Sequence, residues 1–183
     1  VEGLPAPLLY VDEKQINFQL PDLTSLEDLT SVVVTVHRKG IGTYTQVLPI
    51  RLTSPGIFLI GETKRAAAQN QDFSLNTEFN PAAPGSVVFL YATGLGPVNP
   101  PVQAGNAAPL EVLSWTTEEV TATIGNQPAK VLFSGLTPGF AGLMQVNIQI
   151  PDQLAPGEYP VTLKVGGLIS NGGVISVGPK ISE

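Results

Sequence analysis

Residues capable of acid–base or nucleophilic catalysis are few in this sequence. His37 is the only histidine among 183 residues, and it stands beside Arg38 and Lys39 in the stretch VTVHRKG. A solvated strand end explains this position better than a catalytic triad or a metal site does. The sequence contains neither a G-x-S-x-G nor an S-x-x-K motif, so no serine is marked as a nucleophile.

The neighbouring carboxylates do not form a catalytic pattern either. They occur as three pairs of sequence neighbours, Asp12 with Glu13, Glu27 with Asp28, and Glu118 with Glu119. Adjacent residues of a strand point to opposite faces, so none of these pairs can flank one bond as glycosidase carboxylates do. Cysteine is absent, which removes thiolate catalysis, disulfides and cysteine metal sites. We therefore predict a protein that is not an enzyme, with no catalytic residue and no cofactor.

One stretch has the spacing of a calcium-binding loop. Alternate positions of NQDFSLNTEFN carry Asn70, Asp72, Ser74 and Asn76, as the first four ligands of such a loop do. However, Leu75 replaces the turn glycine, and Pro81 stands where the loop needs a bidentate glutamate. The alternative is an Asx-turn hairpin that ties the segment down. We predict no metal site, and these four residues remain the candidate calcium ligands.

Trp115 is the candidate residue for ligand binding. It is the only tryptophan and lies in EVLSWTTEEV. Exposed aromatic side chains can stack on sugar rings, although a single tryptophan more often plugs a core or covers the edge of a sandwich. Polysaccharide binding at Trp115 is therefore an alternative, and the ligand itself is unknown.

Composition indicates the elements that would position these residues. Seventeen prolines, 19 glycines and few helix-forming runs favour short strands joined by turns, so we predict an all-β fold. A net charge of −6 without a Lys/Arg cluster argues against nucleic acid as a partner. The longest apolar runs are strand-sized, so we expect no membrane span.

The cellular location is predicted from weaker features. The chain is free of cysteine, acidic, and rich in Thr, Asn and Gln, as many exported bacterial proteins are. It starts at Val1, so we expect any export signal to have been removed or to lie outside the chain. These features favour an extracellular or cell-surface location.

The sequence contains an internal repeat. QINFQLPDL at residues 15–23 corresponds to QVNIQIPDQL at 145–154, and VEGLPAPLLYV at 1–11 corresponds to IGNQPAKVLFS at 124–134. Further on, SVVVTV at 31–36 matches PVTLKV at 160–165, and both alternate as strands with one buried face do. The second copy also has a beginning, residues 85–123, for which the first copy has no counterpart.

The repeat predicts two tandem immunoglobulin-like β-sandwich modules. We place an incomplete module, without its N-terminal strands, at residues 1–60 and a complete module at 84–183. Residues 61–83 are predicted to be a linker that could form a short hairpin.

A resemblance to a known family adds to this interpretation. Stretches such as LYATGLGPV and GLTPGFAGLMQVN resemble the uncharacterised C-terminal domain family of acidobacterial (Solibacter-type) secreted proteins. Each copy is also similar to an IPT/TIG module of the early-set immunoglobulin type, through a G-x-G strand exit and IQIP…PGEYPVTLKVGG. The resemblance implies extracellular β-sandwich modules, and it implies neither a reaction nor a functional residue.

Together these features predict a non-catalytic structural, spacer or adhesion module of an exported surface protein. An incomplete first module would leave a sheet edge open, which is a template for another strand from a protein partner or from another copy of the chain. A self-assembling subunit completed by strand exchange is therefore an alternative. We also expect Phe140 and Leu143, in the bend GLTPGFAGLM, to pack on their own sandwich or on the other module.

Overall fold

The computed structural model describes residues 1–23 and 29–179, and its regular elements are all β-strands, as the sequence predicts. We call residues 1–50 the N-terminal unit and residues 51–179 the C-terminal unit. The strands of the N-terminal unit are β1 (Leu8–Val11), β2 (Ile16–Phe18), β3 (Ser31–Arg38) and β4 (Gly42–Pro49). Those of the C-terminal unit are β5 (Gly56–Ile57), β6 (Ala68–Asn70), β7 (Val87–Thr93), β8 (Val98–Asn99), β9 (Trp115–Thr116), β10 (Thr121–Ile124), β11 (Gln127–Leu136), β12 (Met144–Gln149), β13 (Gly157–Val165), β14 (Leu168–Ile169) and β15 (Gly173–Val177).

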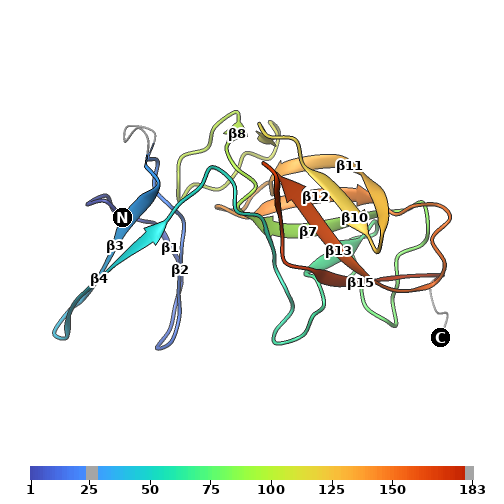
Figure 1. Cartoon of the computed structure of the whole chain (residues 1–183), viewed down its shortest axis with the longest axis horizontal. Helices are drawn as coiled ribbons and strands as arrows, with labels where there is room; N and C mark the ends of the chain where they lie inside the picture. The colour runs from blue at the N-terminus through green and yellow to red at the C-terminus, as the bar shows by residue number, and fades with distance from the viewer. Residues whose placement is uncertain (24–28, 180–183) are drawn as a thin grey trace.

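The N-terminal unit consists of two antiparallel hairpins. Strand β1 pairs with β2 and β3 pairs with β4, and each pair is a separate two-stranded sheet. The carboxylate of Asp12 organises the first turn, because its Oδ1 atom accepts the N–H groups of Lys14 and Gln15 at 2.7 and 2.6 Å. The two hairpins lie apart from the larger body of the molecule in Figure 1.

The C-terminal unit is one curled sheet system with the order β14-β13-β10-β11-β12-β7-β5. The long strand β11 belongs to both of its halves. Residues near its start pair with β10, and residues from Lys130 onward pair with β12. Strand β15 pairs with β13, and β6 adds to β7. The arrangement is consistent with a β-sandwich (Figure 1).

Alternation of side chains builds the core of the C-terminal unit. Strands β7, β12 and β13 each direct every second side chain inward along their central residues, as a period of two requires. The resulting core includes Val88, Leu90, Val146, Ile148, Val161 and Leu163, all 0% exposed. Burying one such side chain contributes about 1.5–3 kcal/mol, so this core stabilises the unit strongly.

Residues 53–83 belong to the C-terminal unit and pack on its strands β7 and β15. Strands β5 and β6 both pair with β7, and the backbone of Arg65 forms a bridge to Val174. The carboxamide of Asn171 binds both backbone groups of Ile57, at 2.7 and 2.9 Å. The sequence interpretation assigned residues 53–60 to the first module and residues 61–83 to a linker, whereas in the structure both ranges lie against β7 and β15.

The internal repeat has a structural counterpart. Strands β1 and β2 pair as Leu8↔Phe18, Tyr10↔Asn17 and Val11↔Ile16, with a bulge between Leu8 and Tyr10. The corresponding residues of β11 and β12 pair as Val131↔Ile148, Phe133↔Asn147 and Ser134↔Val146, with a bulge between Val131 and Phe133. The two pairs therefore share both the register and the position of the bulge.

Two smaller features repeat as well. Gln15 Nε2 donates to Asn17 Oδ1 at 2.6 Å, and Gln145 Nε2 donates to Asn147 Oδ1 at 2.8 Å. Glu2 adopts a φ of 51°, and the corresponding Gly125 a φ of 59°. The phrase that occurs twice in the sequence thus encodes the same strand with the same internal hydrogen bond.

Candidate functional site

The most unusual surface of the molecule is the apolar surface of the N-terminal unit. All four residues of β1 are exposed, including Leu8 at 63% and Val11 at 56%. On β4, Tyr44 and Val47 are exposed by 65% and 62%. Among the described residues of this unit, Val1 and Val32 are the buried apolar side chains. Exposure of several large apolar side chains in one small unit is typical of interaction surfaces.

Equivalent residues of the C-terminal unit show how far this surface departs from a closed core. Ile16 on β2 is 39% exposed, whereas its counterpart Val146 on β12 is 0% exposed. Tyr10 on β1 is 50% exposed, whereas its counterpart Phe133 is 7% exposed. The side chains of the two copies are similar in character, so the difference arises from what covers them.

In the C-terminal unit, the counterpart of β2 has a neighbouring strand on both sides. Strand β12 lies between β11 and β7, and six of its residues pair with β7. In the described N-terminal unit, β2 pairs with β1 and with no further strand. The edge of β2 that corresponds to the β7-facing edge of β12 is therefore open, and open edges are templates for strand addition.

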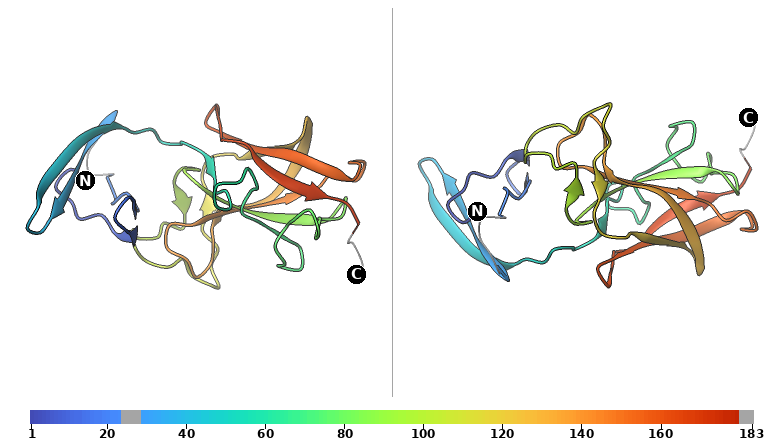
Figure 2. Two further views of the ribbon diagram at one scale, coloured as in Figure 1. Left: turned by 90° about the horizontal axis from the view of Figure 1, so that it is seen from below. Right: turned by 90° about the horizontal axis from the view of Figure 1, so that it is seen from above.

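Loops of the C-terminal unit hold one end of the β1–β2 hairpin. The N–H of Gly105 donates to Oε1 of Gln19 at 2.9 Å. A Cβ atom at Gly105 would lie 2.9 Å from the ring of Pro7, so glycine permits this close approach. Figure 2 shows the loop between β8 and β9 reaching one end of the β1–β2 hairpin. The rest of the N-terminal unit extends away from the C-terminal unit.

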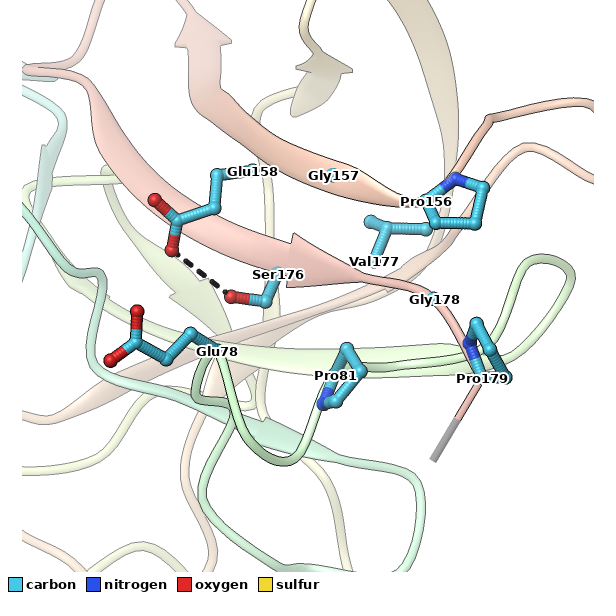
Figure 3. A pocket seen from close by; sticks show the side chains of 9 residues that line it. All are labelled: Glu78, Pro81, Pro156, Gly157, Glu158, Ser176, Val177, Gly178 and Pro179. Carbon is cyan, nitrogen blue, oxygen red and sulfur yellow. Dashed lines mark hydrogen bonds between the residues drawn. The ribbon is translucent and has the colours of Figure 1, made fainter. Parts of the chain in front are cut away.

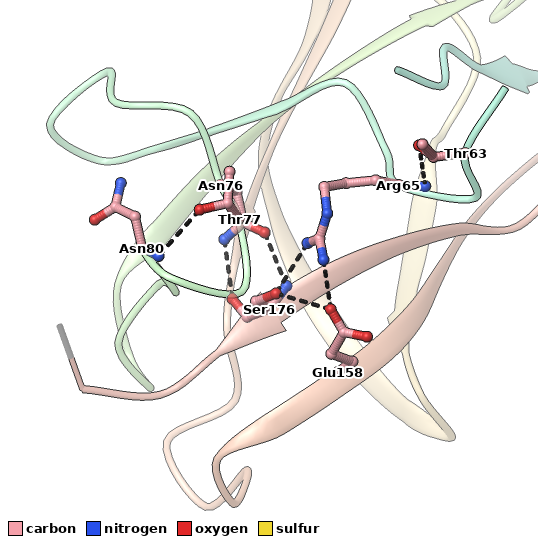
Figure 4. Close-up of polar contacts among 7 residues, drawn as sticks. All are labelled: Thr63, Arg65, Asn76, Thr77, Asn80, Glu158 and Ser176. Atoms are coloured by element: carbon pink, nitrogen blue, oxygen red, sulfur yellow. Dashed lines mark hydrogen bonds and ion pairs between the residues drawn. The ribbon is translucent and has the colours of Figure 1, made fainter. Parts of the chain in front are cut away.

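The candidate calcium ligands form a hydrogen-bonded network. Asn76 is fully buried and its Nδ2 atom donates to Asn70 Oδ1 at 2.8 Å and to the carbonyl of Ser176 at 2.9 Å. Its Oδ1 atom accepts the N–H of Ser176 at 2.8 Å (Figure 4). Asp72 accepts the N–H of Ser74 at 3.1 Å and also bonds its hydroxyl. The amide oxygens of Asn70 and Asn76 are thus engaged inside the chain, where they tie this loop to β15.

An ion pair lies beside the same network. Arg65 pairs with Glu158, and its Nη1 atom donates to the hydroxyl of Ser176 at 2.9 Å (Figure 4). Sequence reasoning missed this contact because Arg65 and Glu158 are far apart along the chain and no motif relates them. The pair joins the segment before β6 to β13 and is more than half exposed at Glu158, so it stabilises only modestly.

A shallow hollow of about 350 Å³ lies on the other side of Glu158. Its lining includes Pro81, Pro156 and Val177, with Glu78 and Glu158 at its rim (Figure 3). Glu158 is already paired with Arg65, and its carboxylate also accepts a hydrogen bond from Ser176 at 3.3 Å. The hollow is therefore a weakly polar depression rather than a site with a free pair of carboxylates.

His37 and Asp12 lie on different hairpins of the N-terminal unit. His37 is exposed near the end of β3, and its Nδ1 atom lies 2.8 Å from the hydroxyl of its cross-strand neighbour Thr43. Asp12 caps the turn of the first hairpin, where hydrogen bonds from the Lys14 N–H and the Tyr10 hydroxyl lower its pKa. Glu27 and Asp28 lie outside the described residues.

Trp115 is half-exposed at the surface. Its side chain is 47% exposed and meets the ring of Phe133 edge-on, with centroids 4.7 Å apart. Strand β9, which carries it, pairs with β8 and β11. This geometry leaves one part of the indole accessible to a ligand while Phe133 fixes its orientation.

The bend GLTPGFAGLM joins β11 to β12. Leu143 is half-buried, but the side chain of Phe140 is 57% exposed, contrary to the expectation that both pack on a neighbour. The backbone explains the position, because the carbonyl of Phe140 accepts the N–H of Ala108 at 3.0 Å. The bend is therefore fixed by main-chain bonds to a neighbouring loop, and these bonds do not require the Phe140 ring.

The fold and these surfaces define the chain as an all-β protein with one closed unit and one open unit. No family model, no curated protein and no solved structure matches the chain. Within residues 1–23 and 29–179, no three His, Cys, Asp or Glu side chains are grouped as metal ligands. The same part of the chain contains no helix that is long and apolar enough to span a bilayer.

Proposed function

We propose that this chain is a non-catalytic structural and adhesion module of an exported bacterial surface protein, built from two tandem immunoglobulin-like units of the IPT/TIG type. The observation that carries the proposal is the apolar surface of the N-terminal unit, with Leu8, Val11 and Tyr44 exposed, beside a C-terminal unit whose core is closed. A closed unit supplies rigidity, and an open unit supplies contact area.

The polar contacts support a structural role for the C-terminal unit. Asn76 and Arg65 bind the strand β15 from a segment about a hundred residues earlier in the chain, at separations of 100 and 111 residues. The Gly105–Gln19 hydrogen bond then connects this unit to the β1–β2 hairpin. A spacer requires such links, because they hold the contact surface at a defined position.

Immunolabelling of the source bacterium tests the proposal. Antibodies against the C-terminal unit should label intact cells, and deletion of the codons for residues 1–183 should reduce attachment between cells or to a surface. Labelling that requires permeabilised cells, or unchanged attachment after the deletion, would contradict the proposed role.

Polysaccharide binding is a second candidate, and the half-exposed Trp115 favours it. Its indole lies edge-on to Phe133 and leaves 47% of its surface accessible. On a glycan array, the intact chain should bind a defined set of sugars and Trp115→Ala should lose that binding. Phe79→Ala, at another exposed aromatic side chain, is the matched control. Equal binding by both variants would exclude Trp115 as the sugar platform.

A further inference from the structure

We infer that the open edge of β2 is a binding site for one extended peptide strand with the apolar pattern of β7, supplied by a polypeptide segment other than residues 1–183. The inference rests on the proposed function and names the partner of its contact surface. The C-terminal unit is the template, because it contains both the counterpart of β2 and the strand that pairs with that counterpart.

The β1–β2 hairpin has the same register as the β11–β12 pair. The β1–β2 and β11–β12 pairs share their pairing and their bulge, so β2 can be superimposed in sequence on β12 without a shift. On its other side β12 pairs as Val146↔Leu90, Asn147↔Phe89 and Ile148↔Val88. A strand bound to β2 in the same register would place its corresponding residues opposite Ile16, Asn17 and Phe18.

The two units also differ in how far the side chains beside these strands are buried. In β7 the side chains of Val88, Leu90 and Ala92 are 0% exposed, and these residues pair with Ile148, Val146 and Met144 of β12 within the same sheet. The corresponding place beside β2 is uncovered, and Ile16 keeps 39% of its surface exposed. A guest strand with apolar residues at alternate positions would therefore pair with the backbone of β2 and cover this side chain at once.

The β7 strand of a second copy is not available as the guest. That strand lies between β12 and the two strands β5 and β6 and carries three fully buried side chains. Its release would expose the core of the C-terminal unit. A free extended segment has no such cost beyond its own ordering, so it is the better guest.

The experiment uses the full chain, labelled with ¹⁵N, and a synthetic peptide that copies residues 85–94, GSVVFLYATG, with lysines added at both ends for solubility. Saturable binding should shift the amide signals of Ile16, Asn17 and Phe18 and slow their hydrogen exchange. Intermolecular NOEs should connect Asn17 with the peptide residue equivalent to Phe89. This last contact is specific to the inferred register.

Two peptide controls distinguish the contribution of the backbone hydrogen bonds to β2 from that of the apolar side chains of the peptide. A peptide with aspartate at the positions of Val88 and Leu90 should bind at least about tenfold more weakly, because the guest then covers no apolar surface. Methylation of the peptide nitrogens at alternate residues should abolish binding for one set of positions and spare it for the other, because only one set faces β2.

In the protein itself, Ile16→Lys should weaken peptide binding by about tenfold or more, since it removes the apolar side chain at the open edge of β2. Ile169→Lys is the matched control, because Ile169 is 66% exposed on β14 of the C-terminal unit, outside the contact surface. It should leave binding unchanged.

Three outcomes would overturn the inference. One is that the peptide neither shifts the amide signals of β2 nor slows their hydrogen exchange. Another is that the Asp-substituted peptide binds as tightly as the native one. The third is protection of β2 that rises with chain concentration without peptide, together with a dimer mass in light scattering, because a second copy would then occupy the edge. None of these results affects the labelling of intact cells, so failure here is distinguishable from failure of the proposed function.

Discussion

At the scale of single residues, Asn76 connects distant parts of the C-terminal unit. It is fully buried, and one side-chain amide satisfies both backbone groups of Ser176 and the carboxamide oxygen of Asn70. A buried backbone group without a hydrogen-bond partner destabilises the fold, so Asn76 contributes more to the free energy of unfolding than an ordinary surface hydrogen bond does.

Replacement of this residue tests that role. We expect Asn76→Ala to lower the free energy of unfolding by about 1–3 kcal/mol, because the N–H and C=O of Ser176 lose their partner. Urea unfolding followed by the fluorescence of Trp115 measures it, since the only tryptophan lies in the C-terminal unit. Asn126→Ala, at an exposed turn residue, is the control and should change stability little.

Gly94 is constrained both by its backbone and by its surroundings. Its φ is 71°, as expected for the sharp exit after the β7 strand, and an added Cβ would lie 2.0 Å from the carbonyl oxygen of Ser54. We expect Gly94→Ala to destabilise the C-terminal unit by about 3 kcal/mol or more. Gly172→Ala, where an added Cβ meets no atom within 4 Å, should be tolerated in the same urea titration.

At the scale of elements, the β1–β2 hairpin depends on the charge of one turn residue. Asp12 accepts hydrogen bonds from the Lys14 and Gln15 N–H groups and from the Tyr10 hydroxyl, and its pKa lies below the ordinary value of 3.8. A lowered pKa means that the folded turn prefers the charged carboxylate. The turn is therefore stabilised by Asp12 above the ordinary pKa and loses this contribution as the pH falls through the lowered value.

An NMR titration can follow this change. The amide signals of Lys14 and Gln15 should move together with a midpoint below pH 3.8, and Asp12→Asn should abolish the transition. The side chain is fully exposed, so the effect should remain local to the hairpin. A midpoint at or above 3.8 would contradict the hydrogen-bonded turn.

The elements differ in how well the sequence predicts them. The period of two along β3 and β13 and the apolar run of β7 mark these strands, and the repeated QINF and QVNI phrases mark β2 and β12. Strands β5 and β6 are two and three residues long, too short for a periodic signal. Their existence depends on pairing with β7, which is distant in the sequence. The same holds for the contact of Arg65 with Glu158.

The candidate site was predictable to a similar extent. The repeated phrases predict that β1 and β2 pair as β11 and β12 do, and the structure has this pairing with no described strand on the other side of β2. Neither the half-exposure of Trp115 nor the engagement of Asn70 and Asn76 inside the chain follows from spacing, because both depend on which strands lie alongside. Spacing alone could equally describe a calcium loop.

At the scale of the whole molecule, the two units should differ in local stability. Val1 and Val32 are the buried apolar side chains of the described N-terminal unit, whereas the C-terminal unit has a continuous core. Local opening is easiest where few apolar contacts must be broken. The hairpins should therefore open while the C-terminal unit remains folded.

Hydrogen exchange with mass spectrometric detection measures this difference. Amides of β3 and β4 should exchange at least about a hundredfold faster than those of β7 and β12 under the same conditions. Binding of the β7-type peptide should slow exchange at β2 and leave that of β12 unchanged. Equal protection of both units in the free chain would contradict the open architecture.

The packing of residues 53–83 on β7 and β15 determines at which residue a stable recombinant fragment can begin. A fragment that begins at residue 84 would lose β5 and β6, bare one edge of β7, and leave Ser176 without Asn76. We expect it to aggregate, whereas a fragment that begins at residue 51 retains these partners and should be recovered as a monodisperse species in gel filtration. The visible repeat boundary and the boundary of the folding unit are therefore separated by about thirty residues.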